Sequence, residues 1–129
     1  MPKIHEDPHY CPIIRTVDYI GNKWKPLILV LLRDGRMRFG KIQMHLPRIS
    51  KKILTEQLRE LENDGLILRY SFNEKPPRVE YEATDIAMGL VPVFEAMHEW
   101  GLKVKDRPSH ISRLTAGSKP AAGSKRAAT

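Results

Sequence analysis

Apolar side chains recur at helical spacing through the first half of the chain. The first predicted helix covers residues 13–20 and ends at Gly21. A second, more uniformly apolar helix covers residues 26–32 and stops before Gly35. The spacing over 39–46 then predicts a short helix, closed by a proline and followed by a tight turn.

The strongest helical pattern begins at Ser50 and ends before Gly65. Serine is a favourable N-cap, and glycine suits the left-handed position after a helix. Leu54, Leu58 and Leu61 recur every three or four residues and form one apolar stripe. The predicted helix is therefore buried on one side and rich in hydrogen-bonding groups on the other. The side opposite the stripe carries Lys52, Glu56, Arg59 and Asn63, and Thr55 lies on its shoulder.

Alternating apolar and polar residues then predict two strands, over 67–72 and 78–83. The proline-rich segment 73–77 between them suits a hairpin tip. Thr84 is the expected cap of a final helix, which Pro92 should kink or divide. This order of elements is that of a winged helix-turn-helix: helix, helix, short helix, tight turn, long helix, hairpin and helix. We therefore expect a mostly helical α+β fold with a β-hairpin wing.

Composition narrows the class of protein. The chain has 129 residues, enough for one domain, and 41% of them are hydrophobic. Its longest apolar run is too short for a membrane span, which needs about 20 residues, and its start lacks the apolar stretch of a secretory signal. A single cysteine excludes an internal disulfide and suits a reducing compartment. These features predict a cytoplasmic protein without a membrane partner.

Charge is distributed unevenly along the chain. Residues 15–52 hold ten basic and two acidic side chains, whereas residues 53–102 hold four basic and ten acidic ones. A domain with one basic face suits the phosphate backbone of DNA, although a solvated mosaic of surface charges is the simpler alternative. We expect residues 1–10 to be an extension, 11–106 to be the domain, and the basic segment 107–129 to be a disordered tail.

Several short motifs together resemble the HxlR family of winged helix-turn-helix regulators. The resemblance runs from about Cys11 to Gly101 and implies a homodimer built partly on the terminal helices and bound to palindromic operator DNA. Ala83 departs from the family's usual leucine, and the tail has no counterpart in the common pattern. The motifs are Cys11-Pro12, Asp18-Tyr19-Ile20-Gly21-Asn22-Lys23-Trp24, Arg38-Phe39-Gly40-Lys41-Ile42, Ile49-Ser50-Lys51-Lys52-Ile53-Leu54-Thr55, Leu58-Arg59-Glu60-Leu61-Glu62-Asn63-Asp64-Gly65-Leu66-Ile67, Pro77-Arg78-Val79-Glu80-Tyr81 and Leu90-Val91-Pro92-Val93.

The predicted partner is double-stranded DNA, read in the major groove by the helix that follows Ser50. Simple solvation of these polar side chains is the alternative, and Arg78 in particular could instead pair with Glu80 or Glu82. We expect three kinds of contact. They are phosphate contacts by Arg38, Ser50 and Lys51, base contacts by Lys52, Thr55 and Arg59, and wing contacts by Lys75 and Arg78.

Cys11 is the candidate sensor of oxidants or electrophiles, because some members of the resembled family carry such a cysteine near the N-terminus. Reactivity requires a lowered thiol pKa, and Pro12 suggests a helix start that favours one. The alternative is a small buried hydrophobe under the dimer contact. His5, His9 and Cys11 match no standard metal site, so we expect no metal and no cofactor.

The last predicted helix carries more apolar surface than a domain of this size readily buries. We expect it to contact a second copy, although an internal core face is the plainer interpretation. These residues are Leu90, Val93, Phe94, Met97 and Trp100. Two rival functions are a winged helix that binds only proteins, and an enzyme using Cys11, which no neighbouring base supports. A small-molecule or redox effector is conceivable but unidentified, and DNA binding would place the protein at the nucleoid.

Overall fold

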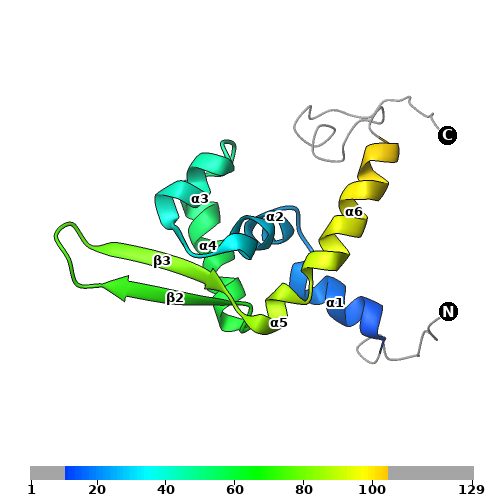
Figure 1. Ribbon diagram of the computed structural model, residues 1–129, viewed down its shortest axis with the longest axis horizontal. Coiled ribbons are helices and arrows are strands. Elements are labelled where there is room, and N and C mark those ends of the chain that lie inside the picture. The colour runs from blue at the N-terminus through cyan, green and yellow to red at the C-terminus, as the bar shows by residue number, and fades with distance from the viewer. Residues whose placement is uncertain (1–10, 105–129) are drawn as a thin grey trace. The chain divides into compact units, whose positions relative to one another are not determined.

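The computed structural model describes residues 11–104, a set of helices from which a two-stranded hairpin projects (Figure 1). The predicted α+β, mostly helical winged helix-turn-helix is confirmed. The elements are α1 (Pro12–Ile20), α2 (Trp24–Leu31), the 3₁₀ turn η2 (Leu32–Asp34), β1 (Met37–Arg38), α3 (Phe39–His45), α4 (Lys51–Asn63), β2 (Ile67–Phe72), β3 (Arg78–Ala83), α5 (Asp85–Met88) and α6 (Val91–Lys103).

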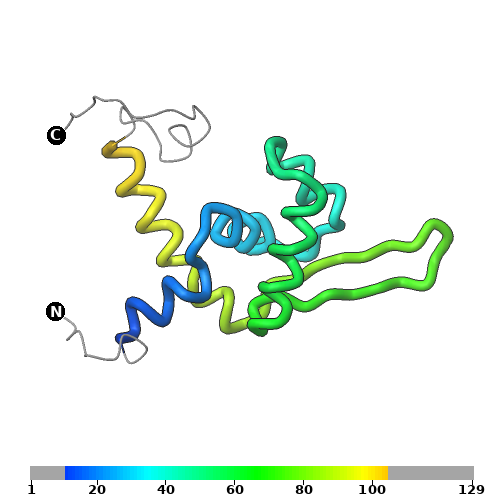
Figure 2. The backbone as a smooth tube through the Cα atoms, turned by 180° about the vertical axis from the view of Figure 1, so that it is seen from behind, coloured from blue at the N-terminus to red at the C-terminus, as the bar shows by residue number. Residues whose placement is uncertain are grey.

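The sheet has the strand order β1-β3-β2 and is antiparallel throughout. β2 and β3 have the predicted bounds, and Ile67 lies opposite Ala83 while Phe72 lies opposite Arg78. Their hairpin extends well beyond α4, as the view from behind shows (Figure 2). The sequence pattern missed β1, because a two-residue strand has no detectable alternation. Its pairing with β3 completes the sheet.

Local capping explains where the helices begin and end. The Ser50 Oγ accepts a hydrogen bond from the Ile53 N–H at 3.0 Å and starts α4. Gly65 follows that helix with a φ of +77°, a conformation that favours glycine. Thr84 caps α5 as predicted, accepting from the Ala87 N–H at 3.4 Å. The final helix is divided into α5 and α6 just before Pro92.

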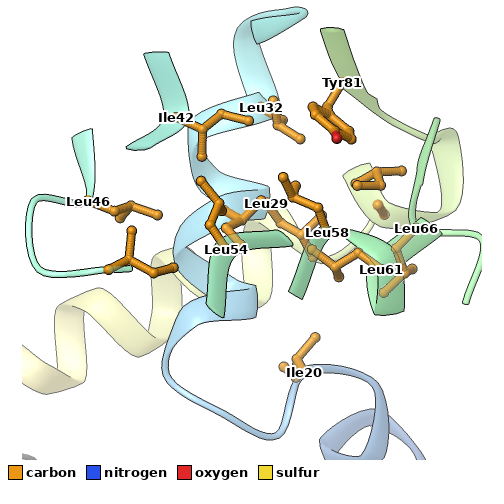
Figure 3. Packing of buried hydrophobic residues seen from close by; sticks show 14 of the residues in the cluster. Ile20, Leu29, Leu32, Ile42, Leu46, Leu54, Leu58, Leu61, Leu66 and Tyr81 are labelled. Atoms are coloured by element: carbon orange, nitrogen blue, oxygen red, sulfur yellow. The ribbon is translucent and has the colours of Figure 1, made fainter. Parts of the chain in front are cut away.

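The core lies between α4 and the elements that surround it (Figure 3). Leu54, Leu58 and Leu61 form the predicted stripe and are almost completely buried. They face Leu29 of α2 on one side and Leu66 on the other. Burying a leucine side chain stabilises a fold by about 1.5–3 kcal/mol, so this stripe anchors α4. Its opposite side is left free of the core.

The residues up to Phe94 form one compact unit, and a second unit begins at Glu95 within α6. The predicted extension 1–10 and tail 107–129 lie outside the described residues. Within 11–104, no helix is both long enough and apolar enough to cross a membrane.

Candidate nucleic-acid interface

The polar side of α4 presents basic side chains to the exterior. Lys51, Lys52 and Arg59 are exposed, whereas the leucine stripe of the same helix is buried. Among the described residues, these three cations make no ion pair or hydrogen bond through their side chains. Their charges are therefore available to an anion, and their donors to the acceptor-rich edge of guanine.

The start of α4 combines a positive helix end with free donors. The first backbone amides of a helix lack partners within it and carry part of the positive helix dipole. Ser50 satisfies the Ile53 amide through its Oγ and keeps its own hydroxyl hydrogen free to donate. Lys51 adds an exposed charge at the same end. Such an end suits a phosphate oxygen.

Thr55 lies on the shoulder of this face and is half-buried. Its Oγ1 donates to the Lys51 carbonyl within the helix at 2.8 Å. The hydroxyl hydrogen is therefore used internally, and the methyl group is the part left for contact with a base. This arrangement suits apolar contact with thymine better than hydrogen-bond donation.

Arg38 is positioned by the strand that the sequence pattern missed. It lies opposite Glu80 in the β1–β3 pairing and precedes the first residue of α3. Beside it is an open depression of about 360 Å³, also lined by Arg36, Lys41 and Glu80. Lys41 was not among the predicted contacts, although its spacing three residues after Arg38 puts both cations near the start of one helix. Arg38 and Lys41 are both exposed.

Arg78 on the wing is held by contacts within the hairpin. The Arg78 Nη2 lies 2.9 Å from the Glu74 Oε2, and the Arg78 Nη1 lies 3.6 Å from the Glu80 Oε2. The guanidinium also stacks 4.1 Å from the centre of the Phe72 ring. The alternative predicted for Arg78, pairing with a hairpin glutamate, is the arrangement found. Lys75 at the tip remains exposed.

A second arginine braces the base of the wing. The Arg36 guanidinium lies 3.8 Å from the centre of the Tyr70 ring and 3.9 Å from carboxylate oxygens of Glu80 and Glu82. The Tyr70 hydroxyl donates to the Glu82 Oε1 at 2.7 Å. This hydrogen bond to the carboxylate raises the pKa of the Tyr70 phenol above its usual value.

Cys11 is fully buried at the N-cap position of α1, with no side-chain capping hydrogen bond. Reactive thiols are typically part-exposed beside positive charge, so this setting matches the predicted alternative of a small buried hydrophobe. On the same helix, Ile13 and Val17 are each 53% exposed and lie one turn apart. α1 therefore offers an unburied apolar face.

The five residues expected at a dimer contact differ in their surroundings. Phe94 belongs to the core of its own chain, with 6% of its surface exposed, and Leu90 packs against that core. These two are therefore core residues, and the plainer interpretation applies to them. Val93, Met97 and Trp100 are exposed and share one face of α6 by their spacing.

Metal ligands do not converge in the described part of the chain. Among residues 11–104, no three histidine, cysteine, aspartate or glutamate side chains are grouped to hold an ion. His5 and His9, considered with Cys11, lie outside the described residues.

Comparisons with known proteins agree with this architecture. Residues 19–109 match the model of the family described as HxlR-like helix-turn-helix. The chain is 44% identical over 114 residues to the uncharacterized HTH-type transcriptional regulator YdeP of Bacillus subtilis strain 168, covering 88% of this chain and 87% of that protein.

Two solved structures are similar in both sequence and fold. The oxidized form of the redox regulator HypR shares 39% identity at a TM-score of 0.68, covering 77% of this chain and all of that one. The reduced form of the transcriptional regulator YodB from B. subtilis shares 33% identity at a TM-score of 0.63, covering 77% of this chain and 98% of that one.

Proposed function

Because the chain belongs to the HxlR-like helix-turn-helix family and is a DNA-binding transcriptional regulator rather than an enzyme, we propose that it binds a palindromic operator as a homodimer, reading each half-site with α4. The observation that carries the proposal is the exposed, unpartnered basic side of α4, opposite its buried leucine stripe. Arg38, Ser50 and Lys51 contact phosphates and set the register. Lys52, Thr55 and Arg59 face the base edges.

In this proposal the wing has divided roles. Lys75, exposed at the tip, contacts the adjacent backbone. Arg78 is held by Glu74 and Glu80, so it stiffens the hairpin instead of donating to DNA. Lys41 joins Arg38 beside the depression at the start of α3 and adds a further phosphate contact.

The homodimer is supported by apolar surface left open on the terminal helices. Ile13 and Val17 on α1, and Val93, Met97 and Trp100 on α6, are exposed in the single chain. Two copies that each cover these residues would remove them from water, and a two-fold dimer presents two reading helices to a palindrome. Light scattering of the purified full chain measures its oligomeric state directly. A monomer at micromolar concentration contradicts the proposed homodimer.

The reading-helix assignment is tested on DNA selected from a random duplex library by the wild-type chain. Lys52→Ala and Arg59→Ala should each weaken binding to the selected operator about fivefold or more, because a well-placed base contact contributes about 1–3 kcal/mol of discrimination. Lys23→Ala is the matched control, since the Lys23 Nζ lies over the Trp24 ring and the side chain makes no hydrogen bond or ion pair with α4 among the described residues. Unchanged operator affinity in both α4 variants refutes the assignment.

The rival function is a winged helix that binds only proteins. DNA binding driven by phosphate contacts should weaken steeply with added salt. Failure of the wild-type chain to bind any duplex at low salt favours the rival.

A response to oxidants through Cys11 is a second candidate, favoured by similarity to HypR and YodB, two regulators crystallised in stated redox forms. In this reaction the thiolate sulfur would attack hydrogen peroxide, take one oxygen and release hydroxide, giving a sulfenic acid. Because Cys11 is buried, the start of α1 must open first.

Cys11→Ser should keep operator binding and lose its response to peroxide. Mass spectrometry of the treated wild-type chain measures the added oxygen. A variant that responds like the wild type, or a wild-type chain whose operator binding peroxide leaves unchanged, contradicts sensing at Cys11.

A further inference from the structure

Polar contacts join the start of α2 to the side of α4 that faces neither the core nor the proposed DNA surface. The Asn22 Nδ2 donates to the Gln57 Oε1 at 2.8 Å. The Lys25 Nζ lies 2.7 Å from the Glu60 Oε1. Gln57 and Glu60 lie about one turn apart, so the two contacts hold successive turns of α4.

The α2 end of these contacts is itself rigid. The Asn22 Oδ1 accepts from the backbone N–H groups of Trp24 at 2.9 Å and Lys25 at 3.0 Å, fixing the first turn of α2. Only 9% of the Lys25 side chain is exposed, against 54% of that of Glu60. The ammonium is therefore held in a nearly buried position with a defined direction.

Hydrophobic packing restricts the rotation of α4 about its axis less sharply than directional contacts do. Apolar contact is non-directional, whereas hydrogen bonds and close ion pairs depend on geometry. At about 100° per residue, Gln57 and Glu60 lie between about 80° and 160° around the helix from Lys52 and Arg59. A rotation of about 10° moves a side chain near the edge of a helix, about 6 Å from the axis, by about 1 Å. That displacement is enough to spoil a hydrogen bond to a base edge.

We infer that Asn22 and Lys25 are positioning residues that set the rotation of the reading helix α4 through Gln57 and Glu60. The inference rests on the proposed function, since it concerns how accurately α4 meets base edges. Phosphate contacts tolerate small rotations better than paired base contacts, because the phosphate backbone attracts cations regardless of sequence. Loss of the Asn22–Gln57 hydrogen bond or the Lys25–Glu60 ion pair therefore reduces the sequence specificity of binding more than the overall affinity for DNA.

The test uses Lys25→Met and Gln57→Met in the full-length chain. Methionine keeps an unbranched apolar stem at both positions. Removing the buried ammonium leaves Glu60 with a largely solvated carboxylate, so Lys25→Met avoids an uncompensated buried charge. Lys23→Met is the matched control, because it removes a neighbouring lysine whose side chain lies over the Trp24 ring and makes no hydrogen bond or ion pair with α4 among the described residues.

Lys25→Met and Gln57→Met should each lower the ratio of operator affinity to random-duplex affinity about tenfold or more, which is the scale of one lost base contact. Random-duplex affinity, its salt dependence and the melting temperature should stay near wild-type values, which a purely structural defect would not allow. An unchanged ratio in both variants at wild-type stability overturns the inference. If the wild-type chain itself binds no duplex, the proposed function fails, which is a distinguishable result.

Discussion

Ser50 serves two purposes in the proposed complex, and substitutions can separate them. Its Oγ accepts from the Ile53 N–H at 3.0 Å, and its hydroxyl hydrogen is directed in the proposal to a phosphate. Ser50→Ala removes both. Losing an N-cap costs about 1 kcal/mol, within a range of about 0.5–2. For a domain of 60–100 residues that lowers the melting temperature by about 4–8 °C.

Ser50→Asp keeps the capping acceptor and adds a negative charge at the positive helix end, which contributes about 0.3–1 kcal/mol. Its stability should equal or exceed that of the wild type. A carboxylate about 4 Å from a phosphate charge is repelled by about 1 kcal/mol in bulk water and about 4 kcal/mol at an effective dielectric of 20. Operator affinity should therefore fall between about fivefold and several hundredfold for each half-site.

Ser50→Asn is the matched control, because asparagine caps as well as aspartate but carries no charge. Thermal unfolding followed by circular dichroism measures stability, and fluorescence anisotropy of a labelled operator at fixed salt measures affinity. Ser50→Asp should be more stable than Ser50→Ala but should bind the operator more weakly. If Ser50→Asp and Ser50→Asn bind equally well, no phosphate lies beside Ser50, and the register of α4 on DNA must be redrawn.

Three other outcomes are expected. Leu58→Ala should lower the free energy of unfolding by about 2–5 kcal/mol in chemical denaturation, since this side chain is only 2% exposed in the core; a loss below about 1 kcal/mol contradicts the packing described. Lys51→Ala should weaken all duplexes about equally and reduce the slope of log affinity against log salt by about 1 per protomer, measured by titration at several salt concentrations; a sequence-dependent loss contradicts a phosphate contact. Because Glu82 raises the pKa of Tyr70, the neutral phenol contributes stability that is fully present below the ordinary tyrosine pKa of about 10 and is lost as pH rises through the higher folded value. Subtracting the ultraviolet titration of Tyr70→Phe from that of the wild type isolates this group, and a midpoint at or below pH 10 contradicts the raised pKa.

Arg78 on the wing and Arg36 beside it are charged residues that contact the hairpin itself. Arg78 and Arg36 each cover an aromatic ring and meet glutamates of the hairpin. A two-stranded hairpin is only marginally stable on its own, so these contacts and the added strand β1 help hold the wing in shape. Among the proposed DNA contacts, the exposed cations without an ion pair in the described residues are Arg38, Lys41, Lys51, Lys52, Arg59 and the tip residue Lys75.

Local features of the sequence determined most of the framework. Ser50, the leucine stripe and Gly65 predicted α4 because a cap, a helical period and a left-handed glycine each act within a few residues. Alternation predicted β2 and β3 with the bounds found. The polar side of α4 followed from the same period, since any helix that buries one stripe exposes the opposite one.

Only the tertiary structure decided what depends on residues far apart in the chain. β1 exists because Met37 meets Tyr81, and this pairing places Arg38 opposite Glu80. The partners of Arg78 and Lys25, and the burial of Phe94, likewise depend on which elements meet in space. Periodicity and capping report only the neighbours a residue has within its own element. Only the folded chain therefore shows whether a given cation is exposed, contacts the hairpin or pairs with a residue of α4.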